Sequence, residues 1–355
     1  MDAISAHIQI SCARHIRWLI GEVVLDSHMV GIKGWALPFG IPAEDYRFLV
    51  NGKPFSDVKW PISSLDLSGV FPILESAKKA RFECTHTFKT LDDICNNGFM
   101  RFDWYAGRPN QRSYRSAWYF PDPRGSAPNP EDHRIARVIG TPDLNSFLLG
   151  GASLHKRFDE YLNETFHRPL STFRSILDWG CGSGRLTRHL STLNGPKITG
   201  CDIDGDNIEW CSEYLKGRFI CAPLLPPLPF NAGEFDLVIG CSVFTHLDEE
   251  KQFVWLDELR RITAPGGIVL ATVQGPSQAA LFRANPELIK RIEQEGFVDR
   301  AVNMQLSGFV EDDYYHDVIQ SRDYIFSKWG AYFQIVDIVD AFGANQDVVV
   351  MRRSG

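Results

Sequence analysis

The stretch Ile-Leu-Asp-Trp-Gly-Cys-Gly-Ser-Gly at residues 176–184 decides the fold of this chain. A short apolar run leads into Asp178, and glycines follow at positions 180, 182 and 184. This pattern is typical of a buried parallel strand that ends in a tight turn, where a ligand can approach the backbone closely. The next residues, Arg-Leu-Thr-Arg-His-Leu, predict the start of a helix, whose free N–H groups favour a polar ligand group.

The glycine spacing distinguishes between two kinds of ligand. A dinucleotide-binding turn needs G-x-G-x-x-G, and here Arg185 takes the place of its third glycine. The pattern D-x-G-x-G-x-G instead resembles motif I of the class I S-adenosylmethionine (SAM) dependent methyltransferases. The resemblance implies that SAM is the cofactor and S-adenosylhomocysteine the product. It also implies cofactor contacts from the turn residues Asp178, Gly180, Cys181, Gly182 and Gly184.

A second strand, Lys197–Asp202, ends in an acidic residue about 20 positions after the first glycine. A carboxylate there suits a ribose diol, because it can accept a hydrogen bond from both hydroxyls. We therefore predict that Asp202 binds the ribose and that Asp204 caps a helix over Asn207–Leu215. The family resemblance implies that Ile203 packs on the adenine.

The downstream segments extend the resemblance. Phe235–Phe244 is a nearly continuous apolar run, which predicts a strand covered on both faces. With the His-Leu that follows, it resembles family motif IV, and we place Cys241 among the cofactor-binding residues. Helical spacing over Glu249–Thr263 is broken by Pro-Gly-Gly before a strand at Ile268–Val273, which is a second family hallmark.

Two last strands, Tyr332–Ala341 and Gln346–Arg353, match the antiparallel hairpin that ends the family fold. The resemblance covers roughly residues 135–353. The expected fold class is therefore α/β, a doubly wound, seven-stranded, mostly parallel sheet with a C-terminal antiparallel hairpin.

The chain departs from the family after its third strand, Arg218–Ala222. Many members carry an acidic residue there that meets the adenine amino group, but this sequence continues with Pro-Leu-Leu-Pro-Pro. Because prolines fix φ and remove donors, we expect a stiff loop. We predict that the backbone near Ala222 and Pro223 makes the adenine contact instead.

Composition narrows the class of protein. A length of 355 residues suggests two domains, and the net charge of −7 argues against a nucleic-acid partner. No run approaches the roughly 18 apolar residues of a membrane span, and no signal peptide is evident. The eight cysteines include no C-x-x-C pair. We therefore expect no metal, no membrane partner and a cytoplasmic location.

The first 130 residues differ in kind, because short apolar runs alternate with turn signals. They predict a smaller β-rich, sandwich-like accessory domain at 1–130, joined by the turn-rich Pro121–Pro130 to a methyltransferase domain at 131–355. Gly31–Leu37 has a faint resemblance to accessory domains of glycan-modifying enzymes. If the protein forms a homo-oligomer, we expect this N-terminal domain to provide the contact between subunits.

Seven arginines and no lysine lie between residues 101 and 137, interleaved with aromatic residues. Arginine forks suit carboxylate or phosphate, and aromatic faces suit sugar rings. The alternative is a strand with core aromatics and solvated arginines, and we favour it.

Two histidines are candidates for a general base, which a hydroxyl or ammonium acceptor requires. His246 follows the fourth strand of the predicted sheet, and His316 lies in an insertion at 275–331 that we interpret as a substrate lid. Tyr315 and Asp317 would orient His316 or replace it, and Arg134 is a further candidate for substrate binding. We expect Trp255 and Phe244 in the core, and His155 and His189 at the surface.

The leading hypothesis is a SAM-dependent methyltransferase that acts on an oxygen of a small molecule or saccharide. N-methylation of a small molecule remains open. A catalytically silent SAM-fold protein that binds a glycan or partner also remains open. A nucleotide-dependent oxidoreductase is disfavoured by Arg185.

Overall fold

The computed structural model describes residues 9–10, 17–90, 93–95, 98–107, 113–125, 127–275, 278, 286–303, 313–343 and 346–355. The chain divides into two compact units. Unit 1 comprises Met1–Ser126, Asp143–Arg157 and Ala280–Arg283, and unit 2 comprises Ala127–Pro142, Phe158–Ala279 and Ala284–Gly355. The helix α4 (Leu144–Phe166) therefore contributes to both units, whereas the sequence places it wholly in the second domain.

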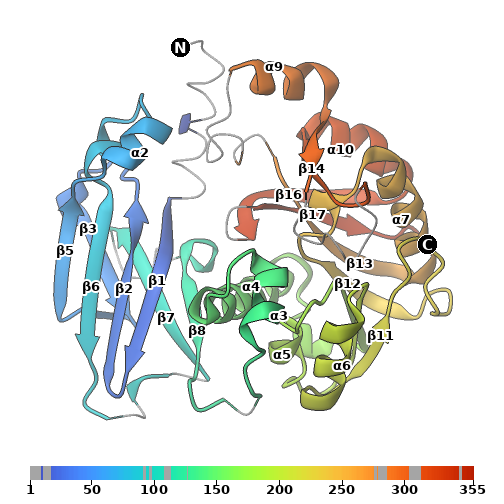
Figure 1. Cartoon of the computed structure of the whole chain (residues 1–355), viewed down its shortest axis with the longest axis horizontal. Coiled ribbons are helices and arrows are strands. Elements are labelled where there is room, and N and C mark those ends of the chain that lie inside the picture. Colours follow the sequence, from blue (N-terminus) through green and yellow to red (C-terminus); the bar gives the residue numbers. More distant parts are fainter. Residues whose placement is uncertain are drawn as a thin grey trace. The chain divides into compact units, whose positions relative to one another are not determined.

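Unit 1 contains two four-stranded antiparallel sheets, with strand orders β1-β2-β6-β5 and β4-β3-β7-β8 (Figure 1). The strands are β1 (Trp18–Asp26), β2 (Met29–Ala36), β3 (Tyr46–Val50), β4 (Lys53–Pro54), β5 (Asp57–Ile62), β6 (Arg81–Thr87), β7 (Phe99–Ala106) and β8 (Trp118–Pro121), and α2 is Leu65–Val70. Aromatic rings join the sheets: Phe48 lies 4.7 Å from Phe82 and 6.1 Å from Trp18. The β-rich fold expected for this part of the chain is confirmed.

The aromatic residues of the arginine-rich region belong to this core. Trp104, Trp118 and Tyr119 are buried, and Arg101 pairs with Asp103 at 2.8 Å. The described strands of the region thus follow the core interpretation, whereas Arg134 and Arg137 lie on a helix, α3 (Asp132–Ile139), and form ion pairs. Arg108 and Arg112 lie outside the described residues.

His155 is buried, so its expected surface position is wrong. Its ring stacks on Phe99 at 5.8 Å, and burial lowers its pKa to about 3.

Unit 2 is built on a seven-stranded sheet of order β11-β10-β9-β12-β13-β17-β16. The strands are β9 (Ser175–Trp179), β10 (Lys197–Asp202), β11 (Arg218–Cys221), β12 (Phe235–Gly240), β13 (Thr263–Val273), β16 (Gln334–Gly343) and β17 (Gln346–Arg352). The first five are parallel to one another, and β17 runs antiparallel to both of its neighbours, β13 and β16, which confirms the expected fold class. The strand order reverses between β9 and β12, where α/β sheets bind ligands.

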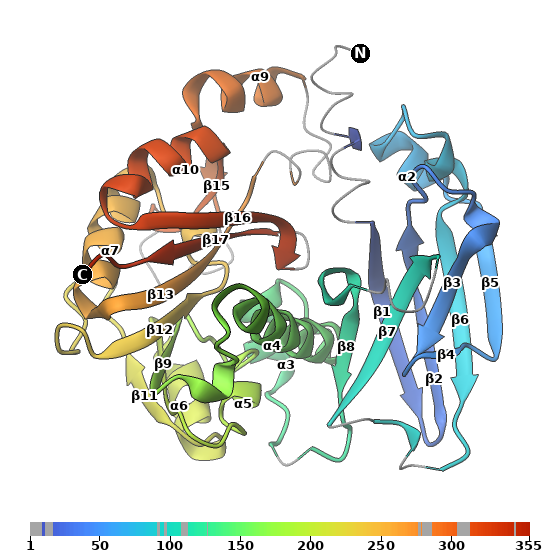
Figure 2. The same cartoon turned by 180° about the vertical axis from the view of Figure 1, so that it is seen from behind.

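Helices cover both faces of this sheet, with α5 and α6 on one side and α7 and α10 on the other (Figures 1 and 2). The helices are α3 (Asp132–Ile139), α5 (Thr187–Leu190), α6 (Gly205–Tyr214), α7 (Glu249–Ile262), α9 (Pro286–Glu295) and α10 (Arg322–Lys328). A two-stranded ribbon, β14 (Phe297–Val302) and β15 (His316–Gln320), lies in the predicted insertion. Phe244 and Trp255 are in the core, as expected.

Buried Asp236 fastens the start of the sheet. Its carboxylate accepts hydrogen bonds from the Ser175 N–H at 2.9 Å, the Arg174 N–H and the Arg168 guanidinium. Hydrogen bonds to a charged acceptor are worth about 1.5–3 kcal/mol each, and their loss leaves buried donors unmet.

We expect Asp236→Ala to lower the free energy of unfolding of unit 2 by about 2–4 kcal/mol. Urea unfolding followed by circular dichroism measures this loss. Asp257→Ala, on the exposed face of α7, is the matched control and should change it by less than about 0.5 kcal/mol. Equal transition midpoints for the two variants would contradict this assignment.

Candidate functional site

The glycine turn after β9 needs glycine at each of its three positions. Gly180, Gly182 and Gly184 all have positive φ, at 74°, 52° and 78°. An added Cβ would lie 2.4 Å from Val243, 2.6 Å from Val138 and 2.5 Å from Leu215, respectively. The turn is therefore packed against three other segments, and Gly180 and Gly182 line a pocket.

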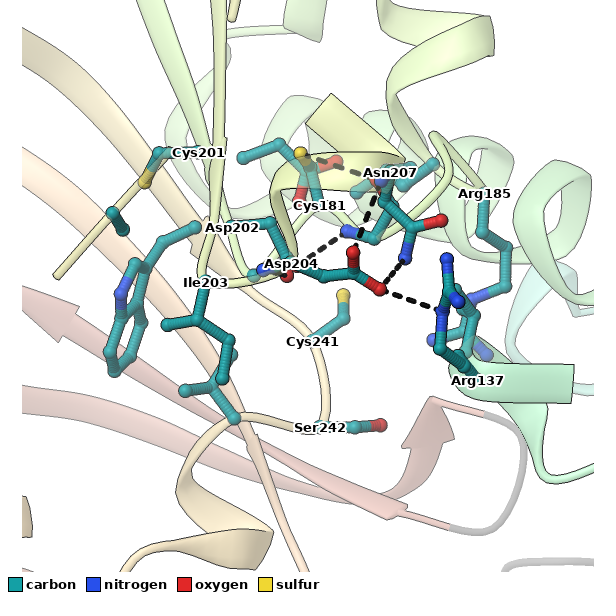
Figure 3. Close-up of a pocket in the computed structure, with 18 of the residues that line it drawn as sticks. Arg137, Cys181, Arg185, Cys201, Asp202, Ile203, Asp204, Asn207, Cys241 and Ser242 are labelled. Atoms are coloured by element: carbon teal, nitrogen blue, oxygen red, sulfur yellow. Dashed lines mark hydrogen bonds and ion pairs between the residues drawn. The ribbon is translucent and has the colours of Figure 1, made fainter. Parts of the chain in front are cut away.

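Asp202 ties the end of β10 to this turn. Its Oδ2 accepts the Gly182 N–H at 2.7 Å, and its Oδ1 accepts the Asp204 N–H at 2.9 Å (Figure 3). At the end of β9, Asp178 is buried and accepts a hydrogen bond from the Thr187 hydroxyl. Burial raises the pKa of each carboxyl to about 6, and hydrogen bonds offset part of that rise.

A pocket opens between the turn and the carboxyl ends of β10 and β12 (Figure 3). The predicted site residues that line it are Asp178, Gly180, Cys181, Gly182, Asp202, Ile203, Ala222, Cys241 and Tyr315. Two predicted cofactor residues are not in its lining: Gly184 packs on Leu215, and Pro223 is exposed.

Several lining residues were missed by the sequence analysis. They are Arg137, Val138, Arg185, Leu186, Asp204, Asn207, Ser242, Leu247, Trp255 and Tyr314. The Tyr314 hydroxyl donates to the Leu224 carbonyl at 2.5 Å. A residue of the insertion at 275–331 therefore contacts the proline-rich loop after β11, where this chain lacks the acidic residue of many family members. The Asn207 Oδ1 atom is buried and has no partner among the described residues. The predicted helix cap at Asp204, three residues before Asn207, is the one local sequence feature that indicated either of these two lining residues.

Ion pairs hold α3 against the start of α6. Arg137 pairs with Asp204 at 2.7 Å, and Arg134 pairs with Asp206 at 2.8 Å. Asp206 also accepts from Arg137, which keeps its pKa below the usual range. Arg134 is thus a partner of α6, whereas Arg137, one turn further on, lines the pocket.

His246 lies at the carboxyl end of β12, behind Tyr315. Its Nδ1–H donates to the His316 carbonyl at 2.8 Å and lies 3.5 Å from Asp317 Oδ1. The Tyr315 ring stacks on the imidazole with a centroid distance of 4.0 Å. The contact with His246 lowers the pKa of Asp317.

The structure brings His246 into contact with the backbone of His316, but the His316 ring has other partners. The His316 ring instead lies 2.7 Å from Asp299 Oδ2, as successive residues of β15 point to opposite faces. His189 is buried, so its expected surface position is wrong. The described residues hold no cluster of metal-ligating side chains and no helix that is long and apolar enough to cross a membrane.

The site has the features of a SAM-binding α/β domain. A turn with three positive-φ glycines brings Gly180 and Gly182 to the pocket, and a carboxylate ends the second strand. An unmet amide oxygen lies in the pocket wall. These groups fit a ligand that combines a ribose diol with cationic groups, as SAM does.

Comparison with known proteins agrees with this class. Residues 176–267 match the family described as "Methyltransferase domain". A tRNA (carboxymethyluridine(34)-5-O)-methyltransferase of Arabidopsis thaliana is 32% identical over 123 residues, which are 34% of this chain and 29% of that protein. The mitochondrial ubiquinone biosynthesis O-methyltransferase of Dictyostelium discoideum is 31% identical over 30% of this chain and 37% of that protein.

A solved structure, the 1,6-didemethyltoxoflavin-N1-methyltransferase of Burkholderia thailandensis, is 18% identical. It covers 67% of this chain and 96% of its own, with a TM-score of 0.40. The chain spans only about a third of the length of the two curated relatives. It contains a class I SAM-dependent methyltransferase domain, and SAM is the cofactor of that domain.

The two raised carboxyl pKa values predict how SAM affinity depends on pH. A cationic ligand favours ionised carboxylates, so binding below pH 6 must release protons from Asp178 and Asp202. Calorimetry should show the Kd for SAM falling as the pH rises from 5 to 7, and levelling off above. Asp202→Asn should weaken binding at least tenfold at pH 7.5 and reduce the pH dependence. The same Kd and pH profile as the wild type would contradict this role.

The ion pairs of α3 predict a salt-dependent SAM dissociation rate. Asp206→Asn removes a partner of both Arg134 and Arg137, and partly exposed pairs contribute about 0.2–1 kcal/mol each. Stopped-flow fluorescence should show dissociation about fivefold faster at low salt, with the difference shrinking at 1 M salt. Glu209→Gln, on the exposed face of α6, serves as the control. A salt-independent difference would argue against this interpretation of the ion pairs.

Proposed function

We propose that this protein is a SAM-dependent O-methyltransferase whose acceptor is a small molecule or a saccharide. The observation that carries the proposal is the fixed imidazole of His246 at the carboxyl end of β12, beside the lining residue Tyr315. SAM supplies a methyl group that is already activated by its sulfonium. The task left to the protein is to align the acceptor and to remove its proton.

His246 is the proposed general base. Because its Nδ1–H donates to the His316 carbonyl, the other ring nitrogen, Nε2, is left as the proton acceptor. The Asp317 carboxylate, 3.5 Å from Nδ1, would stabilise the imidazolium that forms. Tyr315, which stacks on the imidazole and lines the pocket, would hold the base beside the acceptor. In this proposal His246 is the base and the His316 ring takes no part in the reaction.

The remaining assignments follow from the site. Asp178, Asp202 and the glycine turn would hold the cofactor, with Ile203 and Ala222 at the adenine. Arg134 would act on the cofactor site through α6 and would not touch the acceptor. Although one similar protein is named for action on tRNA, the net charge of −7 favours a small acceptor in a cytoplasmic setting.

Nitrogen as the acceptor atom is the second candidate, because the same base would serve an ammonium group. A catalytically silent protein would bind SAM without releasing S-adenosylhomocysteine. Both alternatives are distinguished by a screen in which tritiated SAM is incubated with hydroxyl-bearing and amine-bearing small molecules. Transfer to amines only would overturn the O-methyl assignment, and SAM binding with no transfer would support the silent alternative.

With an acceptor from that screen, we expect His246→Gln to lower kcat about 10²- to 10⁴-fold. The Kd for SAM should stay within twofold of the wild type, because the imidazole is not in the lining of the pocket. His28→Gln, on an exposed turn of unit 1, is the control. A kcat that is unchanged in His246→Gln would remove this residue from the mechanism.

A further inference from the structure

Three buried polar residues come from segments that adjoin one another near the carboxyl end of β13. They are Gln274, which follows that strand, Gln320, which ends β15, and Asp347, which pairs with Val273 across the β13–β17 ladder. The Gln320 N–H donates to the Gln274 carbonyl at 2.9 Å, so the two residues are adjacent. All three side chains are at least nine-tenths buried. We refer to these three residues as the amide–carboxylate cluster.

The cluster has unmet hydrogen-bonding groups. Both side-chain atoms of Gln320, Nε2 and Oε1, and the Oε1 of Gln274 have no partner among the described residues. Asp347 uses Oδ1 to accept from the Gln278 amide at 3.1 Å and the Ala341 N–H at 2.8 Å. Each unmet buried polar group costs about 1–3 kcal/mol. A ligand with matching groups would recover that free energy.

One hydrogen bond connects this region to the cofactor pocket. Ser242 lines the pocket, and its hydroxyl donates to Oε1 of Gln346, the residue before Asp347, at 3.0 Å. Ser242 has a φ of 61°, which L side chains rarely adopt, and its N–H donates to the Thr272 hydroxyl at 2.6 Å. Strained residues of this kind gather at functional sites. In α/β sheets, ligands bind beyond the carboxyl ends of the strands, so a methyl acceptor belongs on this side.

We propose that the amide–carboxylate cluster binds the methyl acceptor and selects a neutral, polyhydroxylated molecule of the sugar type. The inference rests on the proposed function and adds the acceptor class to it. An amide both donates and accepts, as a hydroxyl does, so each unmet Gln atom matches a sugar hydroxyl. A carboxylate also accepts from hydroxyls.

Other acceptor classes fit the cluster less well. An anionic acceptor would be repelled by Asp347, and Arg322, the nearby cation among the described residues, already pairs with Asp340 at 3.1 Å. A flat apolar acceptor would leave the amide atoms of Gln320 and Gln274 unmet. A cationic amine could donate a hydrogen bond to Asp347 but could not accept one from Nε2 of Gln320. A cationic probe is therefore included in the test.

The test is saturation-transfer NMR on the full chain saturated with S-adenosylhomocysteine. The probes are methyl α-D-mannopyranoside and methyl α-L-rhamnopyranoside as neutral sugars, sodium glucuronate as an anion, glucosamine as a cation and indole as a flat uncharged aromatic. We expect binding of at least one neutral glycoside, and at least tenfold weaker binding in Gln320→Leu and in Asp347→Asn. The control Gln334→Leu, at an exposed position of β16, should bind as the wild type does.

Two further readouts separate recognition from folding and from cofactor binding. If the Gln320 amide is unmet in the free protein, Gln320→Leu should keep or raise the Tm, whereas loss of a structural hydrogen bond would lower it. The Kd for S-adenosylhomocysteine should stay within twofold in every variant. Glycoside binding that survives both substitutions would overturn the inference, as would binding of only the anion, the cation or the aromatic probe. Failure of the wild-type protein to bind S-adenosylhomocysteine would instead refute the proposed function.

Discussion

The hydrogen bond from the Gly182 N–H to Asp202 Oδ2, at 2.7 Å, is the contact on which the rest of the site depends. It fixes the turn after β9 against the end of β10, and residues of both segments line the pocket. The three glycines of the turn also approach Val243, Val138 and Leu215 to distances that no Cβ would allow. Burial raises the pKa of Asp202 to about 6, and this hydrogen bond offsets part of that rise.

The charges around this contact are arranged in two layers. Asp178 and Asp202 form an inner layer whose carboxyls have no paired cation among the described residues. Asp204 and Asp206 form an outer layer that is neutralised by Arg137 and Arg134. An inner layer that lacks a partner charge favours a cationic ligand, and an outer layer of ion pairs fastens the helix that lines the pocket. The ion pairs therefore fix the position of α3, which contributes Arg137 to the wall of the cofactor pocket.

Local sequence was enough to predict the parts that depend on neighbours in the chain. The glycine turn, the acid at the end of β10, the Asp204 cap and the strands of the sheet all follow from periodicity and spacing, and the structure has them at the expected places. The contacts of Arg137, Asn207 and Tyr314 with the pocket were not predictable in this way, because each depends on how distant segments pack. His155 and His189 were misplaced for the same reason: their helical spacing does not reveal what covers them.

The same limit applies to the acceptor side. Gln274, Gln320 and Asp347 carry no motif, and only the folded chain brings them to one edge of the sheet. Residues that bind a shared cofactor are marked by short patterns in the sequence. The groups that select the acceptor come from the insertion and the final hairpin, whose pairing is long-range.

The central claim is that the methyl donor occupies the pocket at the glycine turn. Ultraviolet cross-linking of tritiated SAM to the full chain, followed by peptide mapping, tests it most directly. The account predicts label in peptides that contain the turn at 178–186 or the segment 202–207, and loss of that label when excess S-adenosylhomocysteine is present. Label confined to other peptides, or label that S-adenosylhomocysteine does not displace, would contradict it.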